Sequence, residues 1–397
     1  MTPMQSSAGG TRLMPEGYLA FIPSPLPPTP EFKLDAEGVL ALSNAEFHLG
    51  KLAQIADAVP NPALFAGMYL RREAILSSQI EDISCTLDEV LEYEAGKESP
   101  GHNHDVAQVV NYVRAYNTGL ERLNAENLSA ALLRDLHAIL LEGETEANPG
   151  AFRAQQNWIG RKGASLFEAD FVPPPEQVML QGLGNIDFFI NEYQGPMSPL
   201  IRCALAHSQF ETVHPFKDGN GRIGRLLVAL MLHQMKKLEK PLLFLSLYLL
   251  ENRAEYYQRL MSVRSQGDWQ GWVKFMLLGI ELAAKEAVSM SERLQALQQE
   301  MEKLTSKLPR AAPLLILLYQ YPIINSRGVE KHLKVSLDTA IEWLQKFEAL
   351  KILRETTGRR RSRIYRFDRY IDILDAGWTE RKKSKAAEVT GQERSLG

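Results

Sequence analysis

The chain has 397 residues, of which 45% are hydrophobic and 23% are charged, as in an ordinary globular protein. A single core rarely grows to this length, so two or three domains are expected. The net charge of −3 excludes a global bias toward nucleic acid or membrane, and either partner would need a local patch.

Cysteine usage and apolar runs indicate the cellular compartment. The two cysteines, Cys85 and Cys203, are expected to be buried thiols in a reducing environment. The N-terminus has no apolar segment of the secretory type, and the longest apolar run, 241–250, is about half a membrane span. We therefore expect a cytoplasmic protein that does not enter the membrane.

The N-terminal third predicts an arm followed by helices. Residues 1–34 are rich in Pro, Ser and Gly and predict an extended arm, laid over the surface or mobile. Residues 35–100 predict a helical region, because apolar residues recur at i, i+3 and i+4. Within it, Ser77 and Glu81 share one face near a helix C-terminus, where the dipole disfavours a carboxylate. By itself this pattern is most simply explained by a solvated glutamate.

Residues 101–305 predict a helical core that is interrupted once. The segments "NWIG" and "SLFEADFV", separated by "RKG", predict a β-hairpin that packs on the helices or acts as a flap. His102, His104 and Asp105 lie in a Gly/Ser/Pro-rich loop and are interpreted as loop residues, not metal ligands. Helical periodicity covers five stretches of this core: 105–124, 128–143 (with Ser129 as N-cap), 176–193, 245–266 and 269–304.

The C-terminal part changes character. Residues 306–378 read as three short helices, with Ser326 and Ser336 as caps, followed by two β-leaning segments joined by "TGRRRS", which is the pattern of a winged helix-turn-helix. Between residues 351 and 369 there are eight basic and two acidic side chains. Residues 379–397 form a polar tail that is expected to be disordered.

One stretch, 214–225, carries an unusual density of chemistry: His-Pro-Phe-Lys-Asp-Gly-Asn-Gly-Arg-Ile-Gly-Arg. Helical patterns flank it on both sides. The proline breaks the first helix and biases the backbone of His214 toward an extended conformation. Gly219 and Gly221 lie where the next helix begins, and its unpaired N–H groups and positive dipole end suit a phosphate.

The side chains of this stretch complement a nucleotide. His214 is a candidate base for a hydroxyl proton. Asp218 offers a hard oxygen ligand for Mg²⁺. Arg222 and Arg225 are three residues apart on the first turn of the helix, so both can face one polyphosphate.

The stretch resembles the signature of the Fic family, H-P-F-x-[DE]-G-N-G-R-x-x-R, and matches it at every specified position. The "GAFR…NWIG" run, the hairpin at 163–172 and the N-terminal helices are also similar to Fic proteins, so the resemblance covers roughly residues 35–300. It implies a mainly α fold, a Fic-type helical bundle with a small β-hairpin flap. Fic enzymes transfer AMP from ATP to a hydroxyl of a target protein with Mg²⁺.

The resemblance also implies roles. His214 would deprotonate a Ser, Thr or Tyr of the target, Asp218 would hold the metal, and Phe216 would anchor the loop. Arg222 would bind the β-phosphate side and Arg225 the γ-phosphate. The implied ATP-binding residues are Gly219, Asn220, Gly221, Arg222, Ile223, Gly224, Arg225, Tyr256 and Tyr257, with a core role left open for one tyrosine. The flap would bind the target backbone by strand addition through Asp170, Phe171 and Val172.

The family further gives Ser77 and Glu81 a second interpretation. Residues 77–82, "SSQIED", are similar to the inhibitory motif [ST]-x-x-x-E-[GN] of Fic proteins. Glu81 would then pair with Arg225 and keep it from the γ-phosphate, or position a water for removal of AMP. Asp82 replaces the usual Gly or Asn, which leaves the strength of inhibition open.

Several alternatives stay open at this point. Within enzymes, these are removal of AMP and transfer of another phosphate-containing group, such as UMP or phosphocholine. A DNA-binding regulator is the alternative of another class, although the helix at 336–350 carries Asp338, Glu342 and Glu348 against one lysine. Winged helices also serve as dimer modules, so a homodimer is the other partner considered.

Overall fold

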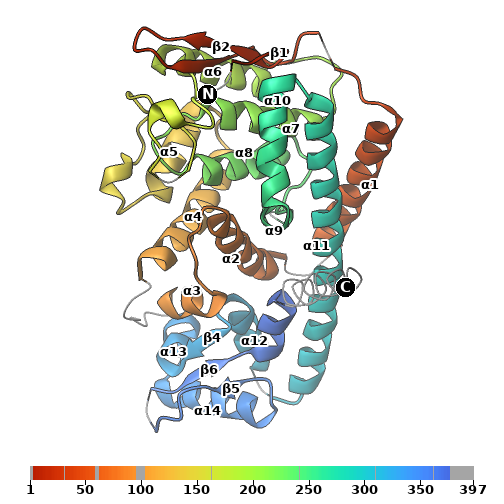
Figure 1. Cartoon of the computed structure of the whole chain (residues 1–397). Helices are drawn as coiled ribbons and strands as arrows, with labels where there is room; N and C mark the ends of the chain where they lie inside the picture. The colour runs from red at the N-terminus through yellow and green to blue at the C-terminus, as the bar shows by residue number, and fades with distance from the viewer. Residues whose placement is uncertain are drawn as a thin grey trace, which may run out of the picture. The chain divides into compact units, whose positions relative to one another are not determined.

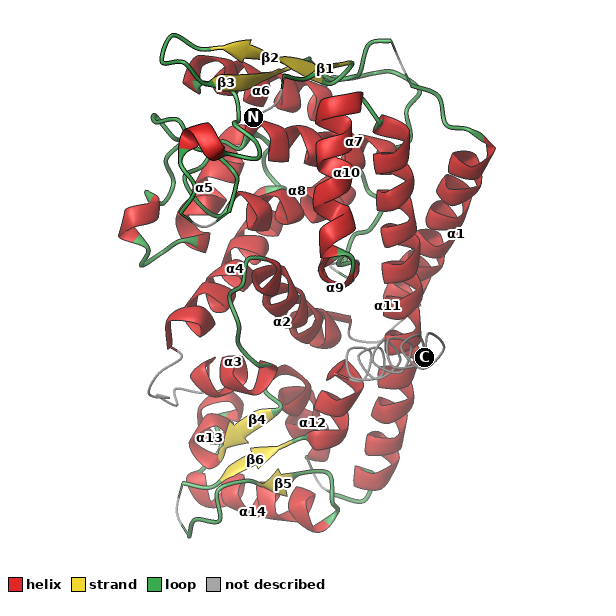
Figure 2. Ribbon diagram, in the orientation of Figure 1, coloured by secondary structure: helices red, strands yellow, loops and turns green. Residues whose placement is uncertain are grey.

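Helices dominate the computed structural model, as the sequence predicts (Figure 2). The structure describes residues 3–30, 32–58, 62–94, 103–161, 163–240, 242–308, 310–360 and 362–375. The polar tail expected from residue 379 and the predicted loop residue His102 lie outside these ranges. The other two predicted loop residues, His104 and Asp105, lie instead in the first turn of a helix that begins at Asn103. No helix in the described ranges combines the length and apolar character that a bilayer span requires.

The helices follow the predicted order with one added break. The stretch predicted as one helix over 245–266 is divided at Asn252, whose side chain donates to the Tyr248 carbonyl at 2.8 Å. In chain order the helices are α1 (Ala36–Ala58), α2 (Pro62–Ile80), α3 (Leu87–Glu94), α4 (Asn103–Arg122), α5 (Ala130–Leu140), α6 (Glu176–Asn191), α7 (Pro199–Val213), α8 (Asn220–Gln234), α9 (Ser246–Glu251), α10 (Arg253–Gln266), α11 (Trp269–Thr305), α12 (Ala311–Gln320), α13 (Ser326–Leu333) and α14 (Leu337–Ala349) (Figure 1).

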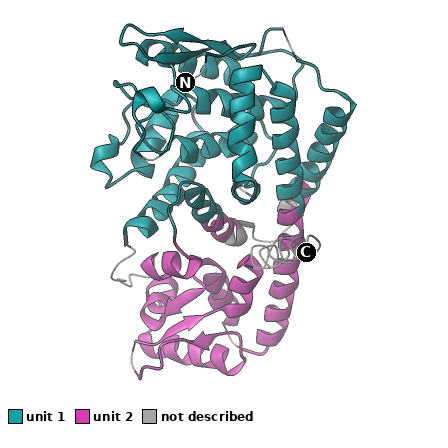
Figure 3. Ribbon diagram, viewed as in Figure 1, with its two compact units in different colours: residues 1–53, 73–84, 104–285 teal, residues 54–72, 85–103, 286–397 magenta. Residues whose placement is uncertain are grey.

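The chain forms two compact units (Figure 3). The first contains residues 1–53, 73–84 and 104–285, and the second contains 54–72, 85–103 and 286–397. The predicted N-terminal helical region of 35–100 therefore belongs partly to the first unit and partly to the second.

The core of the first unit is built on α7 and α8, which pack against each other and are joined by the stretch at 214–219. Helix α7 buries its side chains from Cys203 to Val213 without a break, and these include the polar residues His207, Ser208, Gln209, Glu211 and Thr212. Helices α5, α6 and α10 cover this pair. Trp272 of α11 fills the interior, and its indole N–H donates to the Ala204 carbonyl at 2.8 Å. The predicted site therefore begins and ends on the two most deeply buried helices.

The N-terminal arm is more structured than its composition predicts. It forms an antiparallel sheet in the order β1 (Gln5–Ser6), β2 (Gly9–Leu13) and β3 (Leu19–Pro23), which packs against α7 and α10 (Figure 1). Composition alone misses it because tertiary contacts stabilise it: Phe21 is fully buried against the ring of Phe171, with centroids 5.7 Å apart.

The hairpin predicted for residues 163–172 is also different in the structure. Its two segments pair at a single antiparallel bridge, in which Ile159 and Phe171 exchange hydrogen bonds of 2.8 and 3.0 Å. Residues 166–168 form one turn of 3₁₀ helix, because Ser165 and Glu168 make a reciprocal capping box that holds the chain out of the extended conformation. Leu166 then packs onto the cluster of Tyr18, Ala20, Ala169 and Val172.

The C-terminal part of the second unit contains α12, α13 and α14 and an antiparallel sheet. The sheet order is β4 (Ile323–Asn325), β6 (Ile364–Arg366) and β5 (Arg354–Glu355), so a strand precedes α13 that the sequence did not predict. Ser336 caps α14 as predicted, but Asn325, not Ser326, caps α13, since its carboxamide oxygen accepts the Gly328 N–H at 2.8 Å. These elements lie where the winged helix is expected.

The contact of the N-terminal sheet with the flap leads to a prediction. Phe21→Ala should lower the free energy of unfolding by about 3–5 kcal/mol, because a fully buried aromatic ring leaves a cavity. It should also speed hydrogen exchange at the amides of Ile159 and Phe171, since the Phe21 ring packs on the Phe171 ring with centroids 5.7 Å apart. Denaturant unfolding and exchange measured by mass spectrometry check both effects.

Leu13→Ala is the matched control, because Leu13 lies on the same sheet and is 67% exposed. It should change stability by less than about 0.5 kcal/mol. Equal effects of the two substitutions would contradict the role of Phe21.

Candidate active site

The stretch at 214–219 turns sharply between α7 and α8. His214 ends α7 with φ 48° and ψ 62°, the left-handed conformation, and its N–H donates to the Phe210 carbonyl at 2.9 Å. The expectation of an extended His214 is therefore wrong, because the hydrogen bond that closes the helix end overrides the preference set by the following proline. Gly219, at φ 76°, is the N-cap of α8, and no side chain caps this helix. The helix start thus keeps its N–H groups for an anion.

Buried polar groups that the sequence analysis did not select hold the loop in place. The Arg153 guanidinium donates to the carbonyls of His214 at 2.9 Å and Pro174 at 2.6 Å, and its backbone N–H donates to Pro215. Asn220 closes the loop by accepting the Phe216 N–H at 2.9 Å and donating to the Phe216 carbonyl at 2.8 Å. The side chain of Asn220 is therefore used within the loop.

Phe216 anchors the loop, as the resemblance implies. It is fully buried and stacks on the His137 imidazole with ring centroids 3.8 Å apart. His137 in turn contacts the Asp218 carbonyl through Nε2 at 3.0 Å and accepts the Gly150 N–H at 3.0 Å. Burial lowers the pKa of His137 to about 4, so this support is a neutral ring.

A cavity of about 680 Å³ opens beside this loop, which is the volume of a site for a small molecule. Eight residues selected from the sequence line it: Glu81, Asp170, Phe171, His214, Gly221, Arg225, Tyr256 and Tyr257. The other selected residues, all of them described, do not line it: Ser77, Val172, Asp218, Gly219, Asn220, Arg222, Ile223 and Gly224. Lining residues that the sequence analysis missed include Trp158, Glu211, Arg253, Met261 and Arg264.

His214 is a neutral imidazole at this cavity. Burial, together with the guanidinium groups of Arg264 and Arg153, lowers its pKa to about 3. Its Nδ1 atom is buried and has no hydrogen-bond partner among the described residues. A neutral imidazole can accept a proton, so His214 has the protonation state that a base requires.

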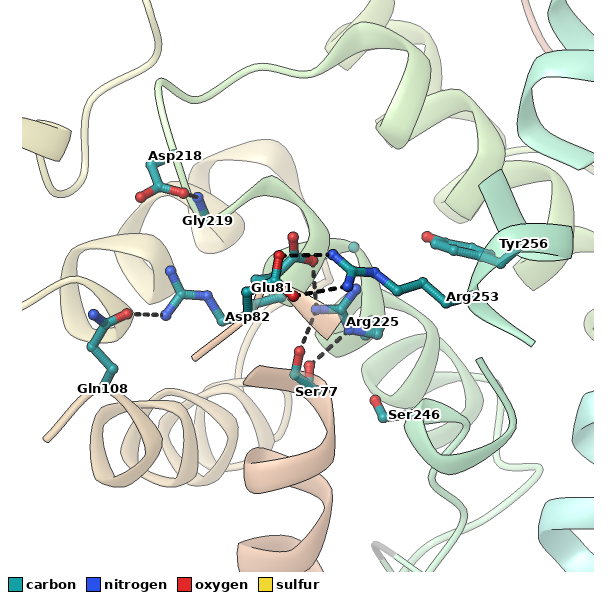
Figure 4. A network of polar contacts seen from close by, with 12 residues as sticks. Ser77, Glu81, Asp82, Gln108, Asp218, Gly219, Arg225, Ser246, Arg253 and Tyr256 are labelled. Atoms are coloured by element: carbon teal, nitrogen blue, oxygen red, sulfur yellow. Dashed lines mark hydrogen bonds and ion pairs between the residues drawn. The ribbon is translucent and has the colours of Figure 1, made fainter. Parts of the chain in front are cut away.

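Arg225 is held by the end of α2 (Figure 4). Its Nε donates to the Ser77 hydroxyl at 2.7 Å, and its Nη2 donates to the Ser77 carbonyl at 2.8 Å and to Glu81 Oε1 at 2.9 Å. Burial disfavours the charge on Arg225, but Glu81 and the neighbouring groups raise its pKa above the usual value. Arg225 is thus a buried cation whose carboxylate partner is Glu81.

Gly221 allows this carboxylate to reach the start of α8. A Cβ atom at Gly221 would lie 2.2 Å from Glu81 Oε1, which no side chain could accept without displacing the carboxylate. Glu81 therefore lies against the first turn of α8, on the side of Gly221, in this structure. Glu81 is about one-third exposed, so its carboxylate is accessible from solvent.

Arg222 and Asp218 differ from each other in exposure. Arg222 is 2% exposed and donates to Gln108 Oε1 at 2.5 Å, so it contributes positive potential from the interior. Asp218 is exposed, and its Oδ1 accepts the Gly219 N–H at 2.5 Å. Within the described residues, no three His, Cys, Asp or Glu side chains gather in a way that could hold a metal. Mg²⁺ would fit Asp218 if phosphate oxygens and waters supplied its other ligands, which is how this ion is usually bound.

The two predicted tyrosines have different environments. Tyr256 is 1% exposed, and its hydroxyl pairs with His207 Nε2 at 2.9 Å, so it is a core residue at the cavity wall. Tyr257 is 40% exposed beside it, with ring centroids 5.1 Å apart. Tyr257 is therefore the one of the pair whose ring a planar ligand could cover.

Comparison with known proteins identifies the family. The profile of the Fic/DOC family N-terminal region matches residues 39–121, and that of the Fic/DOC family matches residues 127–232. A Fic family protein from Desulfovibrio desulfuricans has a similar structure, with a TM-score of 0.56 and 23% identity, over 85% of this chain and 97% of that one. Fold and site define a helical protein in which a helix start without a side-chain cap lies beside a buried histidine. The chain belongs to the Fic family.

This chain matches two adenylyltransferases over only part of their length. The protein adenylyltransferase fic-1 of Caenorhabditis elegans is 31% identical over 182 residues, which are 46% of this chain and 32% of that protein. A probable protein adenylyltransferase of Aquifex aeolicus is 28% identical over 41% of this chain and 48% of its own length. The matched part is thus less than half of either relative.

Glu211 leads to a prediction about pH. It lies one turn before His214, is 6% exposed, and its Oε1 has no hydrogen-bond partner among the described residues. Burial raises its pKa from 4.5 to about 7, with Arg225 opposing the rise and Glu81 adding to it. Between pH 4.5 and pH 7 the folded protein holds a proton on Glu211 that the unfolded chain has released. The free energy of unfolding therefore falls as the pH rises toward 7.

Glu211→Gln removes this titration. From pH 5 to pH 8, the free energy of unfolding should fall more in the wild type than in the variant. The difference between the two falls should be on the order of 2 kcal/mol. Urea unfolding of both proteins at the two pH values measures the difference. Parallel pH profiles would show that Glu211 titrates normally.

Proposed function

We propose that this protein is an adenylyltransferase that moves AMP from ATP to a hydroxyl side chain of a target protein, and that Glu81 holds it in an inhibited state. The observation that carries the proposal is that the histidine and an anion-binding helix start line one cavity, with a carboxylate at the anion position. The names of the relatives support the same reaction.

The chemistry follows from the groups at the cavity. The target hydroxyl oxygen attacks the α-phosphorus of ATP, the bond to the β-phosphate oxygen breaks, and pyrophosphate leaves. His214, neutral because its pKa is about 3, accepts the hydroxyl proton. The N–H groups at the start of α8, from Asn220 and Gly221, bind phosphate oxygens, and Arg225 binds the γ-phosphate.

A metal would act on the exposed side of the loop. Asp218 is the residue proposed to hold Mg²⁺, which would neutralise phosphate charge when bound. The chain supplies positive charge of its own through Arg225 and, from the interior, Arg222. The adenine is proposed to lie on the exposed face of Tyr257.

Inhibition results from competition for one cation. Glu81 accepts from Arg225 and lies over Gly221, so a γ-phosphate and this carboxylate cannot occupy the position together. Two anions in one site repel each other strongly where water is scarce. ATP can therefore bind in the productive orientation only when Glu81 moves out. In the reverse direction the same carboxylate could orient a water to remove AMP.

The target is proposed to dock along the flap. The peptide groups of Phe171 are already paired with Ile159, and both Phe171 and Val172 are buried, so they do not present an open strand edge. Trp158, Gly160 and Asp170 are exposed and line the cavity on this side. A target segment is proposed to meet the flap at these three positions.

Substitution of Glu81 tests the proposal. Glu81→Gly should raise modification with labelled ATP by about tenfold or more, which corresponds to about 1.4 kcal/mol of lost competition. His214→Ala in the same background should lower the rate by at least about a hundredfold, because the proton acceptor is lost. Autoradiography of the purified protein and of cell lysate measures both.

Mass spectrometry of the product distinguishes the alternatives. AMP addition gives the mass shift of one adenylyl group, whereas a UMP or phosphocholine group gives a different one. Loss of an adenylyl group from a modified protein would instead identify the reverse reaction as the preferred one. An unchanged rate in Glu81→Gly would show that the inhibitory role is wrong.

A further inference from the structure

The turn that ends α2 carries a second carboxylate beside Glu81 (Figure 4). Asp82 accepts two hydrogen bonds from one guanidinium group: Arg253 Nη1 donates to Oδ1 at 2.8 Å, and Arg253 Nη2 donates to Oδ2 at 3.1 Å. This hydrogen bonding holds the pKa of Asp82 below its usual range. The pair is therefore ionised and bidentate, which is the most directional form of an arginine–carboxylate contact.

Arg253 also faces the cavity. It lines the cavity together with Arg225 and Tyr257, and its guanidinium carbon lies 5.9 Å from the centroid of the Tyr257 ring. Its side chain is 38% exposed, so it is accessible to a ligand. A second cation thus stands at the cavity wall, and its carboxylate partner follows Glu81 directly in the chain.

The backbone presents the two carboxylates as one piece. Asp82 has φ 62°, a left-handed conformation, and Ser78 accepts the N–H groups of Glu81 at 3.0 Å and Ile83 at 3.1 Å. This closed turn fixes the directions of Glu81 and Asp82 together. Gly or Asn adopts such a conformation at less cost than most residues, and Asp is tolerated there. The contact with Arg253 offsets the cost of Asp at this position.

We propose that Glu81 and Asp82 form a double lock, in which each carboxylate holds one cavity arginine, and that Arg253 is a second ligand for the phosphates of the nucleotide. When the turn moves away, both guanidinium groups become available to the anion. The inference rests on the proposed function, because the nucleotide is ATP.

The two halves of the lock differ in strength. Arg225 is buried at 2% side-chain exposure, whereas Asp82 is exposed at 79%, so water weakens the Asp82–Arg253 pair much more. Loss of the outer pair should therefore change the population of the open turn two- to fivefold. The exposed Asp82–Arg253 pair therefore adjusts the inhibition that the buried Glu81–Arg225 pair sets.

Binding of ATP, measured by calorimetry on the full chain, tests the lock without relying on catalysis. Asp82→Asn keeps the shape and the tolerance for positive φ but removes the charge. It should bind ATP two- to fivefold more tightly than the wild type. Glu255→Gln is the control. It removes a half-exposed carboxylate from α10, the helix that carries Arg253, where Glu255 pairs with Arg259, and it should leave the affinity for ATP unchanged.

The role of Arg253 as a ligand needs a background without the lock. The double variant Glu81→Gly/Asp82→Asn has neither carboxylate of the lock. Adding Arg253→Gln to it therefore measures how much Arg253 contributes to nucleotide binding. ATP should then bind about tenfold more weakly, while adenosine, which lacks phosphates, should bind equally well. Unfolding curves of these variants confirm that the fold is kept.

The outcomes separate the two proposals. If Glu81→Gly binds ATP but Asp82→Asn behaves like Glu255→Gln, the lock is overturned and the proposed function stands. Equal ATP affinity with and without Arg253 overturns its role as a ligand. If Glu81→Gly does not bind ATP, the proposed function fails, and this inference fails with it.

Discussion

The burial of the Arg225 guanidinium is the constraint on which the site depends. A cation this deep requires hydrogen-bond acceptors and a counter-charge, because an unpaired charge in the interior is very costly. Ser77 and Glu81 meet this requirement, and both come from the end of α2, more than 140 residues away in the chain. The same electrostatic demand could be met by a phosphate. In the proposed function, this shared demand is the physical basis on which the carboxylate competes with a substrate phosphate.

Competition of this kind works only if the positions of the competing groups are fixed. The stretch between α7 and α8 is held by donors and rings that do not take part in the chemistry: Arg153 holds its carbonyls, Asn220 closes it, and His137 stacks on Phe216. Gly221 then provides the one place where an anion can approach the helix start. Rigid supports turn a short polar loop into a site with a defined geometry.

The segments around the cavity also come from distant parts of the chain. The N-terminal sheet supports the flap through Phe21, and the turn after α2 closes the cavity on another side. Of these, the turn at Glu81 and Asp82 is the more exposed and is held by ion pairs, so its release depends on another anion taking the place of Glu81 at Arg225. The proposed function thus assigns the chemistry to the supported loop between α7 and α8 and the control to the turn after α2.

The sequence by itself determined the helical class, the extent of most helices and the residues of the loop. These depend on local periodicity, on proline and glycine, and on a motif whose groups lie within twelve residues. Its resemblance to the inhibitory motif also selected Glu81, which the spacing from Ser77 alone would have left as a solvated glutamate. Only the tertiary structure decided what those groups contact. The left-handed His214, the sheet of the N-terminal arm and the reduced hairpin follow from hydrogen bonds and packing between distant segments, which override local preference. Likewise Glu211, Arg153 and the Asp82–Arg253 pair could not be found from spacing, because burial and pairing partners are properties of the folded chain.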